Sequence, residues 1–376
     1  MKPLERVRRT FSYKEVDRPP IDIGSTPNTG INVAACENIS KYLGYAEPVK
    51  VLSDQWQIAA LDEGVLQKLH ADVRGVFAPT PAEYQNRFIS DKRFVDEWGL
   101  VYECPTGSLY YDLVHHPLAE LDRDQLAGYP WPDPSHPGRL AGVREAAKAL
   151  RDEEMYAVAG TPSGGTSLFE RAWYLRGMEQ LLVDMVIDKP FVHLLFEILT
   201  DLQIRRWKSF LHETGPYLDV VCIGDDLAGQ ESTIMSPELY RELIKPYQSR
   251  YFSIIKQLTD AKLFYHSCGN VTPILDDLID IGVDIINPVQ VSAKDMDPSA
   301  LKKSFGEKVV FWGAIDTCDL LNNGTSSQVA EETSRIIALL GEGGGYVVAA
   351  NHNIQADVPP ANIMAMIRAA SATSDI

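Results

Sequence analysis

Short runs of apolar residues, each of strand length, recur along the chain and alternate with longer amphipathic stretches. The longer stretches carry apolar residues at positions i, i+3 and i+4, which is typical of helices that pack on a sheet. The short runs are rich in Val and Ile and nearly continuous, which indicates strands buried on both faces. The predicted strands are residues 20–24, 72–77, 155–160, 218–224, 262–267, 283–288, 308–313 and 345–350. The clearest predicted helical stretches are residues 167–188, 237–258 and 327–341.

The alternation of strands and helices predicts the fold class. Eight strands of this kind favour an α/β (β/α)₈ TIM barrel over an open doubly wound sheet. A barrel can hold a chain of 376 residues in one unit, so we expect residues 1–376 to form a single domain. The distance between the second and third predicted strands is too long for one crossover helix. We therefore expect an inserted segment at roughly residues 79–150.

The predicted insert is rich in aromatic residues and proline. It contains Trp98, Tyr110, Tyr111 and Trp131, together with the sequence YPWPDPSHPGR. One interpretation is a lid or wall of a substrate site, in which Trp98, Tyr110 and Tyr111 contact the substrate. The other is a proline-stiffened loop that packs on the outside of the barrel, because long loops in compact domains are not always functional.

Charge and cysteine content narrow the class of protein. The chain has 35 Lys and Arg against 52 Asp and Glu, a formal charge of −17, which makes nucleic acid and anionic membranes unfavourable partners. Its apolar runs are too short to span a bilayer and its first residues lack a signal-like apolar stretch, so we expect a soluble, cytoplasmic protein. Five widely spaced cysteines argue against a disulfide framework. A functional cysteine is therefore expected to be a metal ligand or a nucleophile.

Reactive and polar residues gather at the predicted carboxyl ends of the strands, where barrel enzymes build their active sites. The candidates there are Asp225, Asp226, His266, Cys268, Asn287, Gln290, Asp316, Asn351, His352 and Gln355. We expect the amides Asn287, Gln290, Asn351 and Gln355 to contact the substrate. Glu170 also follows a predicted strand, but a helix first turn is the commoner explanation for such a residue.

His266 and Cys268 are the most informative pair. Residues i and i+2 of a strand point the same way, so an imidazole and a thiolate would face one centre. Mixed nitrogen and sulfur ligands favour zinc, and a catalytic zinc site needs a third protein ligand. His352 is the best candidate for that ligand, and an oxygen of Asp225 or Asp226 is the alternative. A buried thiol beside a hydrogen-bonded histidine would explain the pair without any metal.

The adjacent acids Asp225 and Asp226 are candidate catalytic residues. Because neighbouring carboxylates repel, one of them could serve as an acid or contact the metal. The alternative is a helix N-cap, but Ser236 followed by Pro237 fits that role better for the next helix.

Several longer segments together resemble the uroporphyrinogen decarboxylase superfamily. They are ERVRRTFSYKEVDRPPIDIG, IGDDLAGQ, MSPELYRELIKPY, HSCGNVTPILDDLIDIGVDIINPVQ, FWGAIDT and GGGYVVAANHNIQADVPPANI. The resemblance covers nearly the whole chain and also implies the (β/α)₈ barrel. Within the superfamily it implies one of two activities, which are decarboxylation of the porphyrinogen without a metal and zinc-dependent methyl transfer to or from a corrinoid.

The residues favour the methyltransferase branch. Decarboxylases carry an Arg-Gln-Ala-Gly-Arg motif shortly after the first strand, whereas this chain has no arginine between Pro19 and Val73. His266 and Cys268 match the His-x-Cys zinc pair of the methyltransferases. Where coenzyme M methyltransferases have a cysteine after the last strand, this chain has His352. A site with one thiolate in place of two is a stronger Lewis acid, which favours a neutral ether oxygen as the group to be polarised.

The leading functional prediction is therefore a zinc-dependent methyltransferase of the O-demethylase type. It would move a methyl group between a small molecule, such as a methyl ether, and a corrinoid (cobalamin) cofactor carried by a partner protein. The alternatives are a tetrapyrrole decarboxylase of the uroporphyrinogen type and a non-catalytic barrel that binds a corrinoid or a metal. The sequence leaves the methyl donor and acceptor, the direction of transfer and the oligomeric state open.

Overall fold

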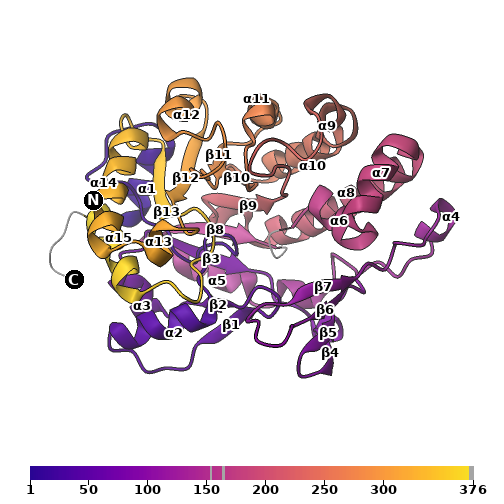
Figure 1. The fold of residues 1–376 in the computed structure, drawn as a ribbon, viewed down its shortest axis with the longest axis horizontal. Coiled ribbons are helices and arrows are strands. Elements are labelled where there is room, and N and C mark those ends of the chain that lie inside the picture. The colour runs from indigo at the N-terminus through magenta and orange to yellow at the C-terminus, as the bar shows by residue number, and fades with distance from the viewer. Residues whose placement is uncertain (153–154, 163–165, 372–376) are drawn as a thin grey trace.

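The computed structural model describes residues 1–152, 155–162 and 166–371, and a parallel sheet of seven strands forms its centre. The strands lie side by side in chain order and the sheet curls (Figure 1). They are β3 (Val73–Phe77), β8 (Ala157–Thr161), β9 (Val220–Gly224), β10 (Lys262–His266), β11 (Ile285–Asn287), β12 (Val310–Ile315) and β13 (Tyr346–Ala350). Seven of the predicted strands are thus confirmed, with ends that shift by a few residues.

The first predicted strand, residues 20–24, is wrong as a strand. Ile21 makes only an isolated parallel bridge to Val348 of β13, and on its other side its carbonyl accepts the N–H of Asp72 at 2.7 Å. The segment therefore lies between the first and last strands of the sheet. Pro20 has no N–H to donate, and Gly24 turns away with φ of +83°, so the ladder cannot extend.

Most of the helices that follow the central strands cover the outer face of the sheet (Figure 1). The main helices are α1 (Pro3–Phe11), α2 (Val33–Tyr42), α3 (Glu63–Lys68), α4 (Arg123–Leu126), α5 (Val143–Asp152), α6 (Phe169–Arg176), α7 (Met178–Ile187), α8 (Lys189–Thr214), α9 (Pro237–Leu243), α10 (Lys245–Leu258), α11 (Leu275–Asp280), α12 (Pro298–Phe305), α13 (Leu320–Asn323), α14 (Ser326–Leu340) and α15 (Pro360–Ser371). Short 3₁₀ turns occupy η1 (Ala82–Tyr84), η2 (Pro137–Leu140), η3 (Gly215–Tyr217) and η4 (Thr272–Ile274). No helix in the described ranges is long and apolar enough to cross a membrane.

Two of the three predicted helical stretches are divided. Residues 167–188 form α6 and α7, which meet at Gly177 with φ of +90°. Residues 237–258 form α9 and α10, which meet at Ile244, two residues before Pro246. Both breaks have local causes, since glycine readily adopts positive φ and proline cannot donate to the preceding turn. Residues 327–341 coincide with α14.

Residues between β3 and β8 carry a second sheet. It is antiparallel, in the order β4 (Arg87–Ser90), β5 (Arg93–Val95), β6 (Val101–Glu103) and β7 (Asp112–His115). Stacked rings of Phe94 and Tyr102, with centroids 5.1 Å apart, hold its middle strands together. A separate hairpin of β1 (Lys50–Ser53) and β2 (Ile58–Ala60) precedes β3. The bounds predicted for an insert, 79–150, stay a prediction.

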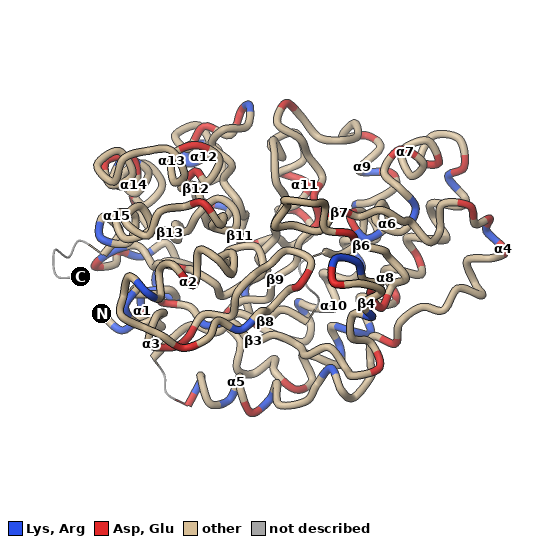
Figure 2. Tube along the Cα trace, turned by 60° about the horizontal axis from the view of Figure 1, so that its bottom comes forward, with Lys and Arg blue, Asp and Glu red and all other residues tan. Residues whose placement is uncertain are grey.

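Alternate residues of the central strands form a core on the concave side of the sheet. This core includes Phe264 of β10, Ile285 of β11 and Trp312 of β12, and α1 covers it with Leu4 and Val7. The other residues of each strand pack against the helices. Burial on both faces explains why the strands read as continuous apolar runs. Charged residues of both signs are interspersed along the helices and loops (Figure 2).

A buried ion cluster fixes the N-terminal segment to the sheet. The carboxylate of Asp72, just before β3, accepts from Arg6 at 2.6 Å and from Arg18 at 2.7 Å. It also accepts the backbone N–H of Ile21 at 2.8 Å. Asp72 is fully buried, so its removal would leave two guanidinium groups without their shared partner.

We expect Asp72→Ala to lower the free energy of unfolding by about 3 to 5 kcal/mol, the usual cost of breaking a buried ion pair. The matched control is Asp17→Ala, which removes a carboxylate that pairs with the same Arg6 but whose side chain is 41% exposed. For the control we expect about 1 kcal/mol or less. Urea denaturation of both variants measures the difference, and equal losses would contradict the role given to Asp72.

Candidate metal centre

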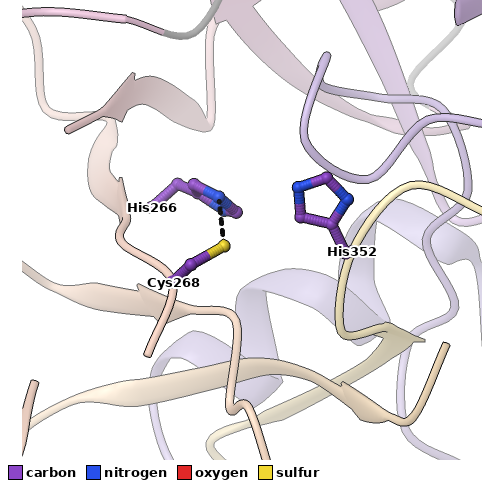
Figure 3. Close-up of side chains that lie close together, drawn as sticks. All are labelled: His266, Cys268 and His352. Atoms are coloured by element: carbon purple, nitrogen blue, oxygen red, sulfur yellow. Dashed lines mark hydrogen bonds between the residues drawn. The ribbon is translucent and has the colours of Figure 1, made fainter. Parts of the chain in front are cut away.

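The structure brings His266, Cys268 and His352 together (Figure 3). One ligand atom from each side chain lies within 4.8 Å of the other two. His266 is the last residue of β10, Cys268 follows two residues later, and His352 lies two residues beyond β13. The three side chains therefore meet at the carboxyl ends of two strands that are far apart in the sequence.

Strand geometry and one hydrogen bond set the orientation of His266. Its side chain points to the concave side, as that of Phe264 two residues earlier does. Its Nδ1 faces the Oδ1 of Asn287, whose own amide nitrogen donates to the carbonyl of Trp312 at 2.9 Å. Because that donation fixes the amide, Nδ1 of His266 carries the hydrogen and donates it. The lone pair of Nε2 is then free and faces Cys268.

The donor atoms fit zinc in type and spacing. Nε2 of His266 and Sγ of Cys268 are 3.5 Å apart. Zinc–nitrogen bonds of about 2.0 to 2.1 Å and a zinc–sulfur bond of about 2.3 Å at a tetrahedral angle separate two ligands by about 3.5 Å. Burial lowers the pKa of His352 to about 4 and also lowers the pKa of His266, so both imidazoles are in the neutral form that binds metals.

Asp226 lies next to these three residues. Its Oδ1 accepts the backbone N–H of Cys268 at 2.8 Å and is 3.8 Å from Nε2 of His266. These contacts hold the turn after β10 in place. The carboxylate also faces the cavity described below, so it is available to a substrate or to a metal.

Asp225 has a different environment. It is fully buried, and its carboxylate accepts the backbone N–H groups of Phe169 at 3.0 Å and Glu170 at 2.6 Å. Asp225 therefore caps the first turn of α6, while Ser236 caps α9 as its sequence indicated. Burial raises the pKa of Asp225 to about 6. Its contacts indicate a positioning role for Asp225.

The cap by Asp225 places Glu170 in the site. Glu170 is buried, and its Oε1 accepts the hydroxyl hydrogen of Tyr174 at 2.7 Å. Burial, together with the nearby charge of Asp226, raises the pKa of Glu170 well above its usual range. No local sequence pattern distinguishes this residue from an ordinary acid in a first helical turn.

A cavity of about 290 Å³, which we call the metal cavity, is lined by two of the three candidate ligands, His266 and His352. The described residues of its lining combine aromatic, amide and acidic side chains and include no Lys or Arg. The lining residues are Asn28, Asn32, Trp56, Ile58, Tyr110, Glu170, Tyr174, Asp226, His266, His352, Asn353 and Gln355. Those from residues 28 to 58 were not predicted, because a loop and a short hairpin carry them and no motif marks them.

The predicted substrate contacts fall into two groups. Tyr110 and Gln355 line the metal cavity, and the tyrosine hydroxyl donates to Oε1 of Gln355 at 2.6 Å. The other amides hold the framework: Asn287 orients His266, Gln290 accepts the N–H of Gly269 at 2.7 Å, and Asn351 accepts the N–H of Thr317 at 3.0 Å.

Trp98 and Tyr111 lie outside the metal cavity. Trp98 is buried and lines a second cavity next to the first. Tyr111 packs against Phe94 with ring centroids 5.0 Å apart, and it is not among the described residues that line either cavity.

Comparisons with known proteins agree with this architecture. The chain is 26% identical over 268 residues to the methylcobamide:CoM methyltransferase MtbA of Methanosarcina acetivorans, covering 69% of this chain and 70% of that protein. It is 24% identical over 242 residues to the uroporphyrinogen decarboxylase of Legionella pneumophila strain Corby, covering 63% of this chain and 65% of that protein. A solved methyltransferase from Methanosarcina mazei superposes with a TM-score of 0.69 at 18% identity over 99% of both chains, which shows a shared fold.

A family model described as uroporphyrinogen decarboxylase matches residues 113–373. That range contains every strand of the central sheet except β3, together with His266, Cys268 and His352. The curated relatives include methyltransferases as well as decarboxylases. The resemblance predicted from the sequence is confirmed, and the chain belongs to the uroporphyrinogen decarboxylase family, with relatives that support its methyltransferase branch.

Proposed function

We propose that this protein is a zinc-dependent methyltransferase that moves a methyl group between a small methyl ether and a corrinoid cofactor on a partner protein. The observation that carries the proposal is the convergence of His266, Cys268 and His352 beside the metal cavity, which the two histidines line. The names of two relatives, both methylcobamide:CoM methyltransferases, support methyl transfer involving a corrinoid. We further propose a cytoplasmic, single-domain enzyme in which the Ile21 bridge stands in for the eighth strand and residues 79–150 form a wall of the site.

Bound zinc would supply a Lewis acid that polarises the ether oxygen and stabilises the leaving alkoxide or phenolate. The rest of the chemistry depends on the side chains around the candidate ligands. Asn287 keeps Nε2 of His266 free, and Asp226 holds the turn that carries Cys268. The aromatic residues Trp56 and Tyr110 offer apolar surface for the organic part of the ether and exclude water from it.

Glu170 and Asp226 are the acidic groups of the cavity. Tyr174 donates to Glu170, and burial favours the protonated form of that carboxyl group. In the proposal Glu170 holds a proton near the leaving oxygen, while Asp226 supports Cys268. Asp225, also predicted to be catalytic, acts through Glu170 by capping α6.

The chemistry of the metal cavity argues against the decarboxylase alternative. A porphyrinogen substrate with many carboxylates needs cations, yet the part of the lining that the structure describes contains acids and no Lys or Arg. The non-catalytic alternative predicts ligand binding without turnover. Methyl transfer that depends on zinc separates the proposal from both alternatives.

We expect the protein purified without chelator to contain about one zinc per chain, and Cys268→Ala to lose most of it. Cys36→Ala is the matched control, because Cys36 is also shielded from solvent but lies in α2, outside the His266, Cys268 and His352 cluster. Metal analysis of the three proteins tests the assignment. Equal zinc content in all three would show that Cys268 is not a ligand.

His352→Cys should keep zinc while weakening ether cleavage, because a second thiolate reduces the Lewis acidity of the metal. His352→Ala should lose most of both zinc and activity. Metal content and methyl transfer to a corrinoid protein are measured side by side. A His352→Ala protein with normal zinc content and normal methyl transfer would show that the third ligand is another residue. Asp226 would then be the next candidate.

Asp226→Asn should retain zinc and lower the turnover number by about tenfold or more, since it removes the negative charge but keeps an oxygen that can accept from Cys268. Asp316→Asn is the control, because Asp316 also follows a strand end but does not line the metal cavity. Steady-state kinetics and zinc analysis decide the outcome. An unchanged turnover number in Asp226→Asn would show that the charge of Asp226 takes no part in the reaction.

A further inference from the structure

The polar side chains that line the metal cavity differ in whether their hydrogen-bonding atoms are already paired. Some of them hold the walls together. The hydroxyl of Tyr110 donates to Oε1 of Gln355 at 2.6 Å, and Nε2 of Gln355 donates to the carbonyl of Asn353 at 2.7 Å. Oδ1 of Asn32 accepts the backbone N–H of Ala34 at 2.9 Å. These atoms are therefore committed to contacts within the protein.

Two asparagines of the same lining have unpaired amide groups. The side chain of Asn28 makes no hydrogen bond to any residue that the structure describes, and neither does Nδ2 of Asn353. Both groups retain accessible surface. Nδ2 of Asn353 offers N–H donors to the cavity, and the amide of Asn28 offers donors and a carbonyl acceptor.

Two carboxyl groups add unpaired acceptors. Oδ1 of Asp226 accepts the N–H of Cys268, and Oε1 of Glu170 accepts the hydroxyl hydrogen of Tyr174. The second oxygen of each carboxyl group has no partner among the described residues. The open atoms of the lining thus include both donors and acceptors. A hydroxyl group complements such a lining, because it both donates and accepts, whereas a carboxylate or sulfonate only accepts.

Backbone contacts hold the two asparagines in place. The hydroxyl oxygen of Thr26 accepts the backbone N–H of Asn28 at 3.2 Å. Oδ1 of Asn353 accepts the N–H of Gly30 at 2.9 Å, and the N–H of Ile354 donates to the carbonyl of Gly30 at 3.0 Å. The loop that carries Asn28 is therefore tied to the segment after β13 that carries Asn353. Little further ordering of these segments is needed when a ligand binds.

The metal cavity offers no net positive charge to an anion. Glu170 and Asp226 are acids of its described lining, which includes no Lys or Arg. Arg171, the next residue of α6, lines the second cavity, where its guanidinium carbon lies 4.6 Å from the ring centroid of Trp98. The charge of a bound zinc ion would be offset by the thiolate of Cys268 and the carboxylate of Asp226, while Glu170 holds a proton in the proposed function. A carboxylate or sulfonate would therefore lose hydration without gaining a compensating cation.

The size and the apolar part of the lining suit a small organic molecule. Trp56 and Ile58 supply apolar surface beside the open amides. The volume of about 290 Å³ is at the lower end of the range of about 300 to 1,000 Å³ that is usual for small-molecule sites.

We propose that Asn28 and Asn353 make the metal cavity selective for an uncharged methyl ether that carries a hydroxyl group. The hydroxyl group exchanges hydrogen bonds with the two amides, and an ether with an anionic group in its place is excluded. This inference rests on the proposed function for the methoxy group, whereas the part of the two asparagines can be tested by binding alone.

Isothermal titration calorimetry with 2-, 3- and 4-methoxyphenol tests the selection. The isomer that binds most tightly should bind about fivefold or more better than methoxybenzene, which lacks the hydroxyl group. It should bind about tenfold or more better than the methoxybenzenesulfonate with the same spacing, which carries a negative charge. The methoxycyclohexanol with the same spacing keeps the hydroxyl group and loses the aromatic ring, so its affinity shows whether the preferred ether is aromatic or aliphatic. The order should be the same for the protein as purified and after removal of zinc with a chelator.

Asn28→Leu should weaken binding of the preferred methoxyphenol by about threefold or more and leave the affinity for methoxybenzene unchanged. The matched control is Asn38→Leu, because Asn38 is exposed on α2 and does not line the metal cavity. The control should bind as wild type does. Asn353→Asp should also weaken binding of the methoxyphenol, since it keeps the oxygen that accepts from Gly30 and replaces the open N–H donor by an acceptor.

Four binding results would overturn the inference. They are no binding of any methoxyphenol at millimolar concentration, equal affinity for the methoxyphenol and methoxybenzene, equal affinity for the methoxyphenol and the sulfonate, and unchanged affinity in Asn28→Leu. A preference for the hydroxyl group that disappears with the zinc would also overturn it, because the metal would then hold that group.

Methyl transfer to a corrinoid protein, measured on the same preparations, separates this inference from the proposed function. Selective binding of the methoxyphenol without any transfer would support the selection by Asn28 and Asn353 and contradict the proposed function. Zinc-dependent transfer that is equally fast from the sulfonate and from the methoxyphenol would support the proposed function and contradict the selection.

Discussion

The direction in which each strand points its side chains is the constraint on which the site depends. On β10 and β11 the inward positions pass from apolar residues, Phe264 and Ile285, to polar ones, His266 and Asn287. His266 and Asn287 are direct partners in the parallel ladder. An imidazole and an amide therefore stand side by side on the concave face, where one hydrogen bond decides which nitrogen is free. A shift of one residue in register would turn both side chains toward the helices.

The same constraint explains why the sequence predicted much of the molecule. Strands buried on both faces are visible as apolar runs, and seven of them were located in this way. The end of each run marks the rim of the sheet, so His266, Cys268 and His352 could be grouped from the sequence alone. The prediction of a strand at residues 20–24 was wrong, because a single buried bridge and a full strand have the same apolar pattern.

Contacts between distant loops were not predictable. The capping of α6 by Asp225 depends on a buried carboxylate at the end of β9, more than fifty residues away in the sequence. No local sequence pattern predicts a contact over that separation. For that reason Glu170 was interpreted as an acid of a first helical turn, although its side chain lines the metal cavity. Trp98 was predicted to contact a substrate, and the structure places it in the lining of the second cavity, next to the metal cavity. Aromatic content identified the region, while the packing of the β4–β7 sheet decided which cavity each ring lines.

The central claim is that one thiolate and two imidazoles of this chain hold zinc. X-ray absorption spectroscopy at the zinc edge tests it most directly, because sulfur and nitrogen neighbours scatter differently and at different distances. The account predicts one sulfur at about 2.3 Å and two imidazole nitrogens at about 2.0 to 2.1 Å, with lighter atoms completing the shell. A spectrum from the zinc-loaded protein without a sulfur neighbour, or with two, would contradict it.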